Sequence, residues 1–151
     1  MTTGLLFGSD QMVAAWFYDS MGYPHYKYDR AVGLIADDKL VGAVLFHNWN
    51  GQNVEISYYG KKTITVGILR SLARFAVQVF NPSRVTLITS KRNKHIMRAL
   101  QKIGFKLEGT QRCFYGRKDT IRNMGVRFVA FHDAIVDCAR LSPPDVKHPA
   151  A

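Results

Sequence analysis

Residues 84–109 read RVTLITSKRNKHIMRALQKIGFKLEG, and this stretch decides the fold. Its first six residues form a β-branched run with the length and composition of a strand. Asn93 then stands where it can cap a helix whose apolar residues recur at i, i+4 and i+7, with Lys, Arg and Gln on the opposite face. Gly104 ends that helix as the residue after its C-cap, and 105–107 begins another strand. The stretch therefore predicts a strand–helix–strand unit.

The rest of the chain supplies further strands and helices around this unit. Apolar runs and alternation predict strands at 4–7, 31–36, 40–47, 54–59, 110–115 and 125–131. Helices are predicted from Ser9 or Asp10 to about residue 20, over 65–80, and from Asp133 to residue 141. The polar turn 37–39 links two of the strands as a hairpin, whereas 54–59, 65–80 and 84–89 make a right-handed βαβ crossover. The predicted sheet is therefore mixed.

Periodicity also predicts which side chains face the core. The first helix is expected to bury Met12, Ala15 and Trp16. The helix over 65–80 is expected to bury Ile68, Leu72, Ala76 and Val79, supported by Leu69 and Phe75. Along the strand 54–59, Val54, Ile56 and Tyr58 share one face, and Glu55, Ser57 and Tyr59 share the other.

Length and composition indicate one globular domain. The chain has 151 residues, of which 47% are hydrophobic and 21% charged. It shows no apolar run of membrane-spanning length and no signal-peptide pattern, so we expect a cytoplasmic protein. Cys113 and Cys138 form no CxxC pair, and the five histidines lie far apart, so no metal site is expected. Residues 1–141 are expected to form the domain and 142–151, with three prolines, a flexible tail.

The net charge of +10 is concentrated in one block of the sequence. Residues 61–127 contain 16 Lys and Arg but only two Asp and Glu, whereas the flanking segments are slightly acidic. A basic block of this kind favours a polyanionic ligand, such as cofactor phosphates, nucleic acid or an acidic protein. A solvated surface that only keeps the protein soluble is the alternative interpretation.

The junction between strand 54–59 and helix 65–80 is a candidate anion site. The amides of a helix N-terminus favour a phosphate there, and Lys61, Lys62, Thr63, Thr65 and Gly67 lie at this point. The chain has neither GxxxxGK[ST] nor GxGxxG. A plain capped helix is therefore the competing interpretation.

The spacing of Asn93, Gly104-Phe105 and Glu108-Gly109 resembles the second half of the GNAT superfamily of N-acetyltransferases, in particular the branch that acetylates protein N-termini, ribosomal-protein acetyltransferases included. The resemblance covers roughly residues 31–131. It implies a single α/β (α+β) domain with a mixed, mostly antiparallel central sheet flanked by helices. It also implies transfer of an acetyl group from acetyl-CoA to an amine by direct attack, and allows a homodimer.

The resemblance further implies which residues hold coenzyme A. The family's Arg/Gln-x-x-Gly-x-Gly/Ala motif, whose amides hold the pyrophosphate, aligns with residues 64–69, where Gly67 matches and Ile64 and Leu69 depart from the pattern. Leu69 is expected to point away from the cofactor. Asn93 matches the residue that binds the pantetheine arm, and Leu100 stands where a general-acid tyrosine is usual. The expected cofactor-binding residues are Ser57, Tyr58, Thr65, Val66, Gly67, Ile68, Leu69, Arg70 and Asn93.

An acceptor amine must lose its proton before it can attack. A lysine-type amine, with a pKa near 10.4, needs a general base more than an α-amine with a pKa near 8 does. Glu55 is the candidate base because the amides of its strand would polarise the thioester carbonyl. The alternative is that Glu55 is only a solvated strand residue or forms a salt bridge to the basic block. Ser57, Tyr115 or water could protonate the thiolate. His47 and Asn48 are candidate substrate contacts.

Three functions remain open from the sequence. The first is an N-acetyltransferase acting on a protein or another acidic acceptor, and the second is a GNAT-like binding module that has lost catalysis, which Ile64, Leu69 and Leu100 favour. The third is a nucleic-acid-binding protein that uses the basic block 61–127. It predicts an affinity that falls steeply with salt, but the chain has no recognised nucleic-acid motif.

Overall fold

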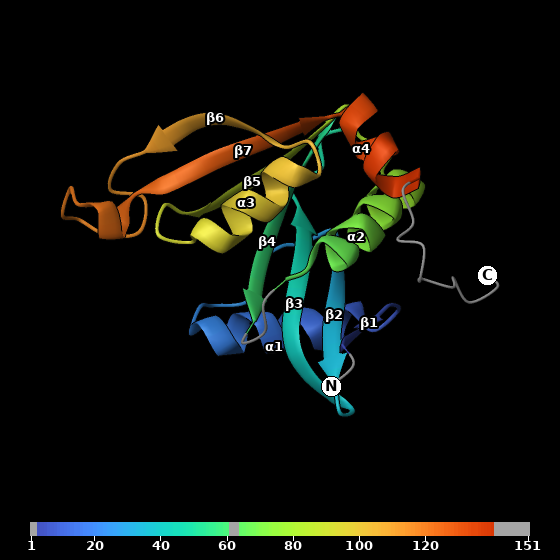
Figure 1. The fold of residues 1–151 in the computed structure, drawn as a ribbon. Coiled ribbons are helices and arrows are strands. Elements are labelled where there is room, and N and C mark those ends of the chain that lie inside the picture. Colours follow the sequence, from blue (N-terminus) through green and yellow to red (C-terminus); the bar gives the residue numbers. More distant parts are fainter. Residues whose placement is uncertain (1–2, 61–63, 141–151) are drawn as a thin grey trace.

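The computed structural model describes residues 3–60 and 64–140 of the chain. Its elements are β1 (Thr3–Leu6), α1 (Asp10–Met21), β2 (Arg30–Ala36), β3 (Lys39–His47), β4 (Asn53–Gly60), α2 (Val66–Val79), β5 (Arg84–Ser90), α3 (Lys94–Lys102), β6 (Lys106–Gln111), a 3-10 turn (Ile121–Asn123), β7 (Gly125–Phe131) and α4 (His132–Arg140) (Figure 1). Lys61, Lys62 and Thr63 of the predicted anion site, and the predicted tail 142–151, lie outside the described residues.

The strands form one seven-stranded sheet in the order β1-β2-β3-β4-β5-β7-β6. Only β4 and β5 pair in parallel, and α2 connects them, whereas all the other neighbours are antiparallel. The hairpin between β2 and β3 turns through Asp37 and Asp38, both at positive φ (51° and 61°), as a two-residue hairpin turn requires. The predicted mixed, mostly antiparallel sheet is confirmed.

Helices cover both faces of the sheet. Helix α1 packs against β2 and β3 on one face, and α2, α3 and α4 pack on the other (Figure 1). Alternate residues of β3 serve the two faces: Val44 and Phe46 belong to the larger core under α2 and α3, whereas Ala43 and Leu45 belong to the smaller core under α1. None of the described helices is long and apolar enough to span a membrane.

The stretch 84–109 folds as its sequence predicts. The Asn93 side chain accepts a hydrogen bond from the amide of Ile96 (3.3 Å) and so caps α3. Gly104 adopts a φ of +99°, the left-handed conformation that follows a helix C-terminus. A Cβ at this position would also come within 3.0 Å of the Ala134 methyl group, so glycine is required for both reasons.

The predicted buried faces of two helices need correction. In α1, Val13, Ala14, Phe17 and Tyr18 are buried, whereas Met12 is 53% exposed and Ala15 and Trp16 are only partly buried. In α2, Val79 is 40% exposed, and the buried residues are Leu69, Leu72, Phe75 and Ala76. Helix α1 is apolar on several sides, so its period alone does not select a face. The contact with β2 and β3 does.

Two predicted boundaries are also wrong. The strand predicted to begin at 105–107 is β6, which starts at Lys106 and continues, with an irregularity between Leu107 and Gly109, only to Gln111, so no separate strand runs from 110 to 115. An ion pair between Arg112 and Asp119 closes the turns that follow it. Helix α4 begins at His132, so Asp133 lies in its first turn rather than at its N-cap.

Candidate active site

The parallel pair β4 and β5 separates halfway along its length. The ladder joins Asn53–Ile56 only to Arg84–Leu87, although β4 continues to Gly60 and β5 to Ser90. Figure 1 shows the two strands diverging, with β4 following β3 and β5 following β7. Because the described strands form no ladder between them beyond this point, an opening forms in the middle of the sheet.

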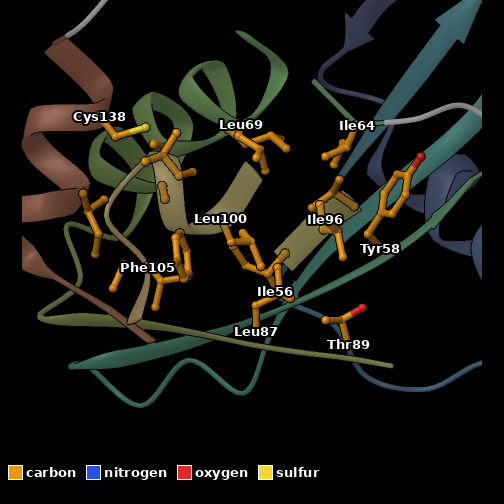
Figure 2. A pocket seen from close by; sticks show the side chains of 18 of the residues that line it. Ile56, Tyr58, Ile64, Leu69, Leu87, Thr89, Ile96, Leu100, Phe105 and Cys138 are labelled. Carbon is orange, nitrogen blue, oxygen red and sulfur yellow. The ribbon is translucent and has the colours of Figure 1, made fainter. Parts of the chain in front are cut away.

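A narrow cavity lies on the helix side of this opening. We call it the helix-side cavity; its volume is about 90 Å³, and it lies between the sheet and helices α2, α3 and α4. Figure 2 shows Leu69 of α2 and Leu100 of α3 pointing into it above Ile56 and Leu87 of the sheet. Leu69 therefore lines this space, and the expectation that it points away from the cofactor stays a prediction. Asn93 lines the same cavity and brings a polar group to otherwise apolar walls.

A wider cavity lies on the opposite face of the sheet. We call it the loop-side cavity; its volume is about 400 Å³. Its walls come from the end of α1, the loop 23–27, the ends of β3 and β5, strand β4, and the turn that holds Phe114 and Tyr115. Ile56, Tyr58 and Ile88 line both cavities, which therefore meet at the opening between β4 and β5.

A polar cluster occupies the loop-side cavity beside the opening. His47 Nε2 lies 2.7 Å from the Ser57 hydroxyl oxygen, and His47 Nδ1 lies 3.5 Å from Glu55 Oε2. Asn48 donates from its side-chain amide to Glu55 Oε2 (2.6 Å) and contacts His47 Nδ1 (3.2 Å). The strand register explains the cluster, because Glu55 and Ser57 share a face of β4 and His47 of β3 is the cross-strand partner of Glu55.

The contacts of Asn48 select one arrangement of protons. If its amide donates to both Glu55 and His47 Nδ1, then Nε2 carries the imidazole hydrogen and donates to the Ser57 oxygen. The Ser57 hydroxyl is then left to donate its own hydrogen elsewhere. Burial lowers the pKa of His47, and the charges of Glu55 and Asp29 only partly oppose this, so the imidazole is neutral at pH 7.

Two tyrosines near the cluster also keep their protons. Burial raises the pKa of Tyr58, which lines both cavities. Burial, together with the neighbouring Tyr23, raises the pKa of Tyr115 in the loop-side cavity. Both phenols are therefore hydrogen-bond donors at neutral pH. No cluster of three His, Cys, Asp or Glu that could hold a metal occurs in the described part of the chain.

The N-terminus of α2 supplies backbone donors at the end of β4. The Thr65 hydroxyl accepts from the amide of Ile68 (3.2 Å), and helix geometry leaves the amides of Val66 and Gly67 without intrahelical acceptors. A Cβ at Gly67 would meet only the Thr65 hydroxyl oxygen, at 3.8 Å, so a ligand can approach this backbone closely. Arg70 lies one turn further along and faces Cys138 of α4.

The structure thus separates the predicted residues into two groups. The three predicted catalytic residues, Glu55, Ser57 and Tyr115, all line the loop-side cavity. Of the predicted cofactor-binding residues, Tyr58, Leu69 and Asn93 line the helix-side cavity, Ser57 lines only the loop-side cavity, and Thr65, Val66, Gly67, Ile68 and Arg70 line neither. Sequence reasoning named His47 only as a substrate contact and missed its hydrogen bond to Ser57. The register of the β3–β4 pair is the signal that could have revealed it.

Comparison with solved structures finds proteins of the same fold at low sequence identity. Mutant forms of the spermidine/spermine N-acetyltransferase SpeG from Vibrio cholerae superpose with a TM-score of 0.62 at 14% identity, over 80% of this chain and 75% of that chain. Spermidine N-acetyltransferase from the same organism, in complex with CoA and spermine, superposes with a TM-score of 0.60 at 15% identity, over 79% of this chain and 73% of that chain. A Bacillus subtilis acetyltransferase in complex with CoA superposes with a TM-score of 0.58 at 16% identity, over 85% of this chain and 97% of that chain.

No family model and no curated protein matches the sequence. The chain nevertheless shares its fold, a single α/β domain built on a mixed seven-stranded sheet, with these acetyltransferase structures.

Proposed function

Starting from this shared fold, we propose that the chain is an acetyl-CoA-dependent N-acetyltransferase. One observation carries the proposal: two cavities on opposite faces of the sheet meet where β4 and β5 separate, beside a cluster of proton-transferring groups. A donor that enters from one face and an acceptor that enters from the other would meet at this opening. Such an arrangement suits direct transfer between two bound molecules.

The helix side fits the acyl donor. Its apolar walls and Asn93 suit the thioester end of a pantetheine arm, and the free amides at the start of α2 suit a pyrophosphate. A volume of about 90 Å³ admits only the end of the arm, so the nucleotide would lie outside the cavity. Bound acetyl-CoA would supply an acetyl group activated as a thioester.

The loop side fits proton transfer from the acceptor. Glu55 is the only carboxylate among the described residues that line this cavity, and it would remove the proton of the acceptor amine, directly or through water. Asn48 holds the carboxylate in place through its 2.6 Å hydrogen bond. Amides of β4 beyond Glu55 border the opening and would stabilise negative charge on the acyl oxygen.

The departing thiolate needs only modest help. A thiol with a pKa near 8.5 leaves readily at neutral pH, so loss of a tyrosine at position 100 is tolerable. The Ser57 hydroxyl, oriented by His47, would be one candidate proton donor, and Tyr115 would be the second. Tyr58, which lines both cavities, is a third donor that the sequence placed with the cofactor instead.

The test combines binding with turnover. Calorimetry with acetyl-CoA measures binding, and thiol release with a panel of primary amines measures transfer. We expect Glu55→Gln to retain acetyl-CoA binding and to lower kcat by about 10²–10⁴-fold, the usual contribution of a general base. Asp137→Asn, on the exposed side of α4, is the matched control and should leave both unchanged. A Glu55→Gln enzyme with full activity would remove Glu55 as the base.

The binding module without catalysis has one observation in its favour. Leu69 and Leu100 fill the helix-side cavity from two helices and leave little space for the arm. This alternative predicts acetyl-CoA binding without turnover for every amine tested, even at high protein concentration. Absence of binding at millimolar acetyl-CoA would contradict both the enzyme and the binding module.

The acceptor follows less directly from the fold. The sequence pointed to a protein or another acidic acceptor, and the resemblance to N-terminal acetyltransferases made a protein α-amine one expectation. None of the Lys and Arg side chains in the described part of the block 61–127 lines the loop-side cavity. We therefore assign the basic block to the phosphates of the donor and look to the cavity itself for the acceptor.

A further inference from the structure

Aromatic side chains surround the mouth of the loop-side cavity. Tyr23 is 57% exposed, Tyr26 76%, Phe114 46% and Tyr115 47%, and all four line this one cavity. Phe17, Tyr18 and Tyr58 continue the aromatic wall inward. Large rings gathered around one opening and left half exposed to water mark a ligand site rather than a packed core.

The charges in this cavity are few. Among the described residues that line it, Glu55 is the only acid and Lys27 the only strong base. Glu55 lies at the opening between β4 and β5, where the acyl group would arrive, and Lys27 belongs to the loop 23–27 at the rim. The described lining therefore offers one carboxylate, Glu55, to a cationic ligand, and this carboxylate lies near the opening where the acetyl group would be transferred.

We propose that the acceptor is a monoamine that carries an aromatic ring, a class to which β-phenylethylamine belongs. This inference rests on the proposed function and names its substrate class. The single ammonium group would pair with Glu55 and face the electron-rich rings, and the acceptor's own ring would lie among Tyr23, Phe114 and Tyr115.

The same inventory argues against a polyamine. Each additional ammonium group would lose water against aromatic walls and find no second carboxylate among the described lining residues. The solved acetyltransferases with a similar fold include enzymes named for spermidine, so the fold does not dictate the acceptor. The residues that line the cavity determine which acceptor fits.

The transfer is balanced in atoms and charge. The amine gives one proton to Glu55, and its lone pair forms the N–C bond to the acetyl carbon while the C–S bond breaks. The nitrogen then releases its second proton, which passes through water to Ser57 as Ser57 gives its own proton to the thiolate. Glu55 releases the first proton to solvent. The net products are the N-acetylamine, free thiol and one proton.

The experiment compares three amines: β-phenylethylamine, hexylamine and spermidine. Calorimetry without acetyl-CoA measures binding of each, and thiol release measures kcat/KM. We expect β-phenylethylamine to exceed both others at least tenfold in kcat/KM and to bind on its own. Equal or higher kcat/KM for spermidine or hexylamine would overturn the inference. If acetyl-CoA does not bind but β-phenylethylamine still does, the proposed function fails and the cavity assignment stands.

Two phenylalanines provide a matched pair of variants. Phe114→Ala removes a ring that is 46% exposed at the cavity, and Phe131→Ala removes one that is 51% exposed at the end of β7, away from it. We expect Phe114→Ala to raise the KM for β-phenylethylamine about tenfold with kcat within twofold, and to change hexylamine less. Phe131→Ala should change neither. Identical effects of the two variants would contradict the inference.

Discussion

At the scale of single residues, His47 shows how burial and a neighbour set the protonation of a side chain. Burial favours the neutral imidazole, and neutrality lets Nε2 donate to Ser57 while Nδ1 contacts Asn48. Protonation would place a hydrogen on Nδ1 and so break its contact with the Asn48 amide. The hydrogen bond from the Asn48 amide to Nδ1 therefore requires a neutral His47.

The lowered pKa of His47 predicts that the free energy of unfolding depends on pH. Because burial lowers the pKa of His47 in the folded protein below 6.5, the unfolded chain binds the proton first as the pH falls. The contribution of His47 to stability is thus complete above pH 6.5 and is lost as the pH falls through the lowered pKa. We expect the free energy of unfolding to drop less between pH 7 and pH 5 in His47→Gln than in the wild type. Urea denaturation at each pH measures it, and parallel curves would contradict the assignment.

The same residue predicts a change in catalysis. Without the imidazole donor, the Ser57 hydroxyl loses its orientation, so His47→Gln should lower kcat more than it raises the KM for acetyl-CoA. We expect the wild-type kcat to fall below pH 6.5 as His47 gains a proton, and the residual kcat of His47→Gln to lack that decrease. A variant that keeps the wild-type pH profile would show that His47 only supports the structure.

Asn93 combines a structural and a proposed binding role. Its side chain caps α3, and it also lines the helix-side cavity. Asn93→Ala should lower the free energy of unfolding by about 1 kcal/mol, the usual effect of losing an N-cap. Asn93→Asp should restore that stability, because aspartate caps equally well, yet bind acetyl-CoA more weakly than the wild type because it cannot donate a hydrogen bond. If the wild type and Asn93→Asp bind acetyl-CoA with equal affinity, then Asn93 only caps α3.

At the scale of elements, α2 forms one wall of the helix-side cavity, where we propose that the acyl donor binds. Leu69 is 7% exposed and packs in the larger core while its side chain lines the cavity. Leu69→Ala should therefore lower the free energy of unfolding by about 2–5 kcal/mol, as buried leucines do. It should also lower the Kd for acetyl-CoA, because it opens the cavity to the arm. Leu34→Ala, at a leucine that is buried in the same core but lines neither cavity, should lose similar stability.

Calorimetry on both variants separates the two effects. If Leu69→Ala and Leu34→Ala bind acetyl-CoA with the same Kd, then Leu69 does not narrow the path of the donor.

At the scale of the whole molecule, the charge distribution differs between the basic block and the loop-side cavity. The block 61–127 carries 16 Lys and Arg against two acids, whereas the described lining of the loop-side cavity holds one acid and one strong base. Long-range attraction should therefore act on an anionic donor and hardly on a monoamine acceptor.

Salt should reveal this division. Raising the ionic strength from about 0.1 M to 1 M shortens the Debye length from about 10 Å to 3 Å. The Kd for acetyl-CoA should rise strongly over this range, whereas the KM for β-phenylethylamine should change less than about twofold. Tight, salt-sensitive binding of nucleic acid that competes with the acceptor would instead favour the nucleic-acid alternative.

Local patterns determined much of this protein. The stretch 84–109, the Asp37-Asp38 hairpin and the alternation along β4 predicted the strands, the cap at Asn93, the stop at Gly104 and the two faces of the sheet. These features depend on backbone preferences of residues that are close in the chain, so the sequence alone specifies them. The sequence left Ser57, Tyr115 and water as alternative proton donors, and the catalytic roles of Glu55, Ser57 and Tyr115 stay predictions.

The tertiary structure decided what depends on distant contacts. The buried face of α1, the end of β6, the inward position of Leu69 and the union of two cavities at the β4–β5 opening each require elements far apart in sequence to meet. The pairing of His47 with Ser57 follows only once the register of β3 and β4 is set. Periodicity tells which residues share a face, but packing decides what that face meets, because burial is a property of the whole assembly of elements.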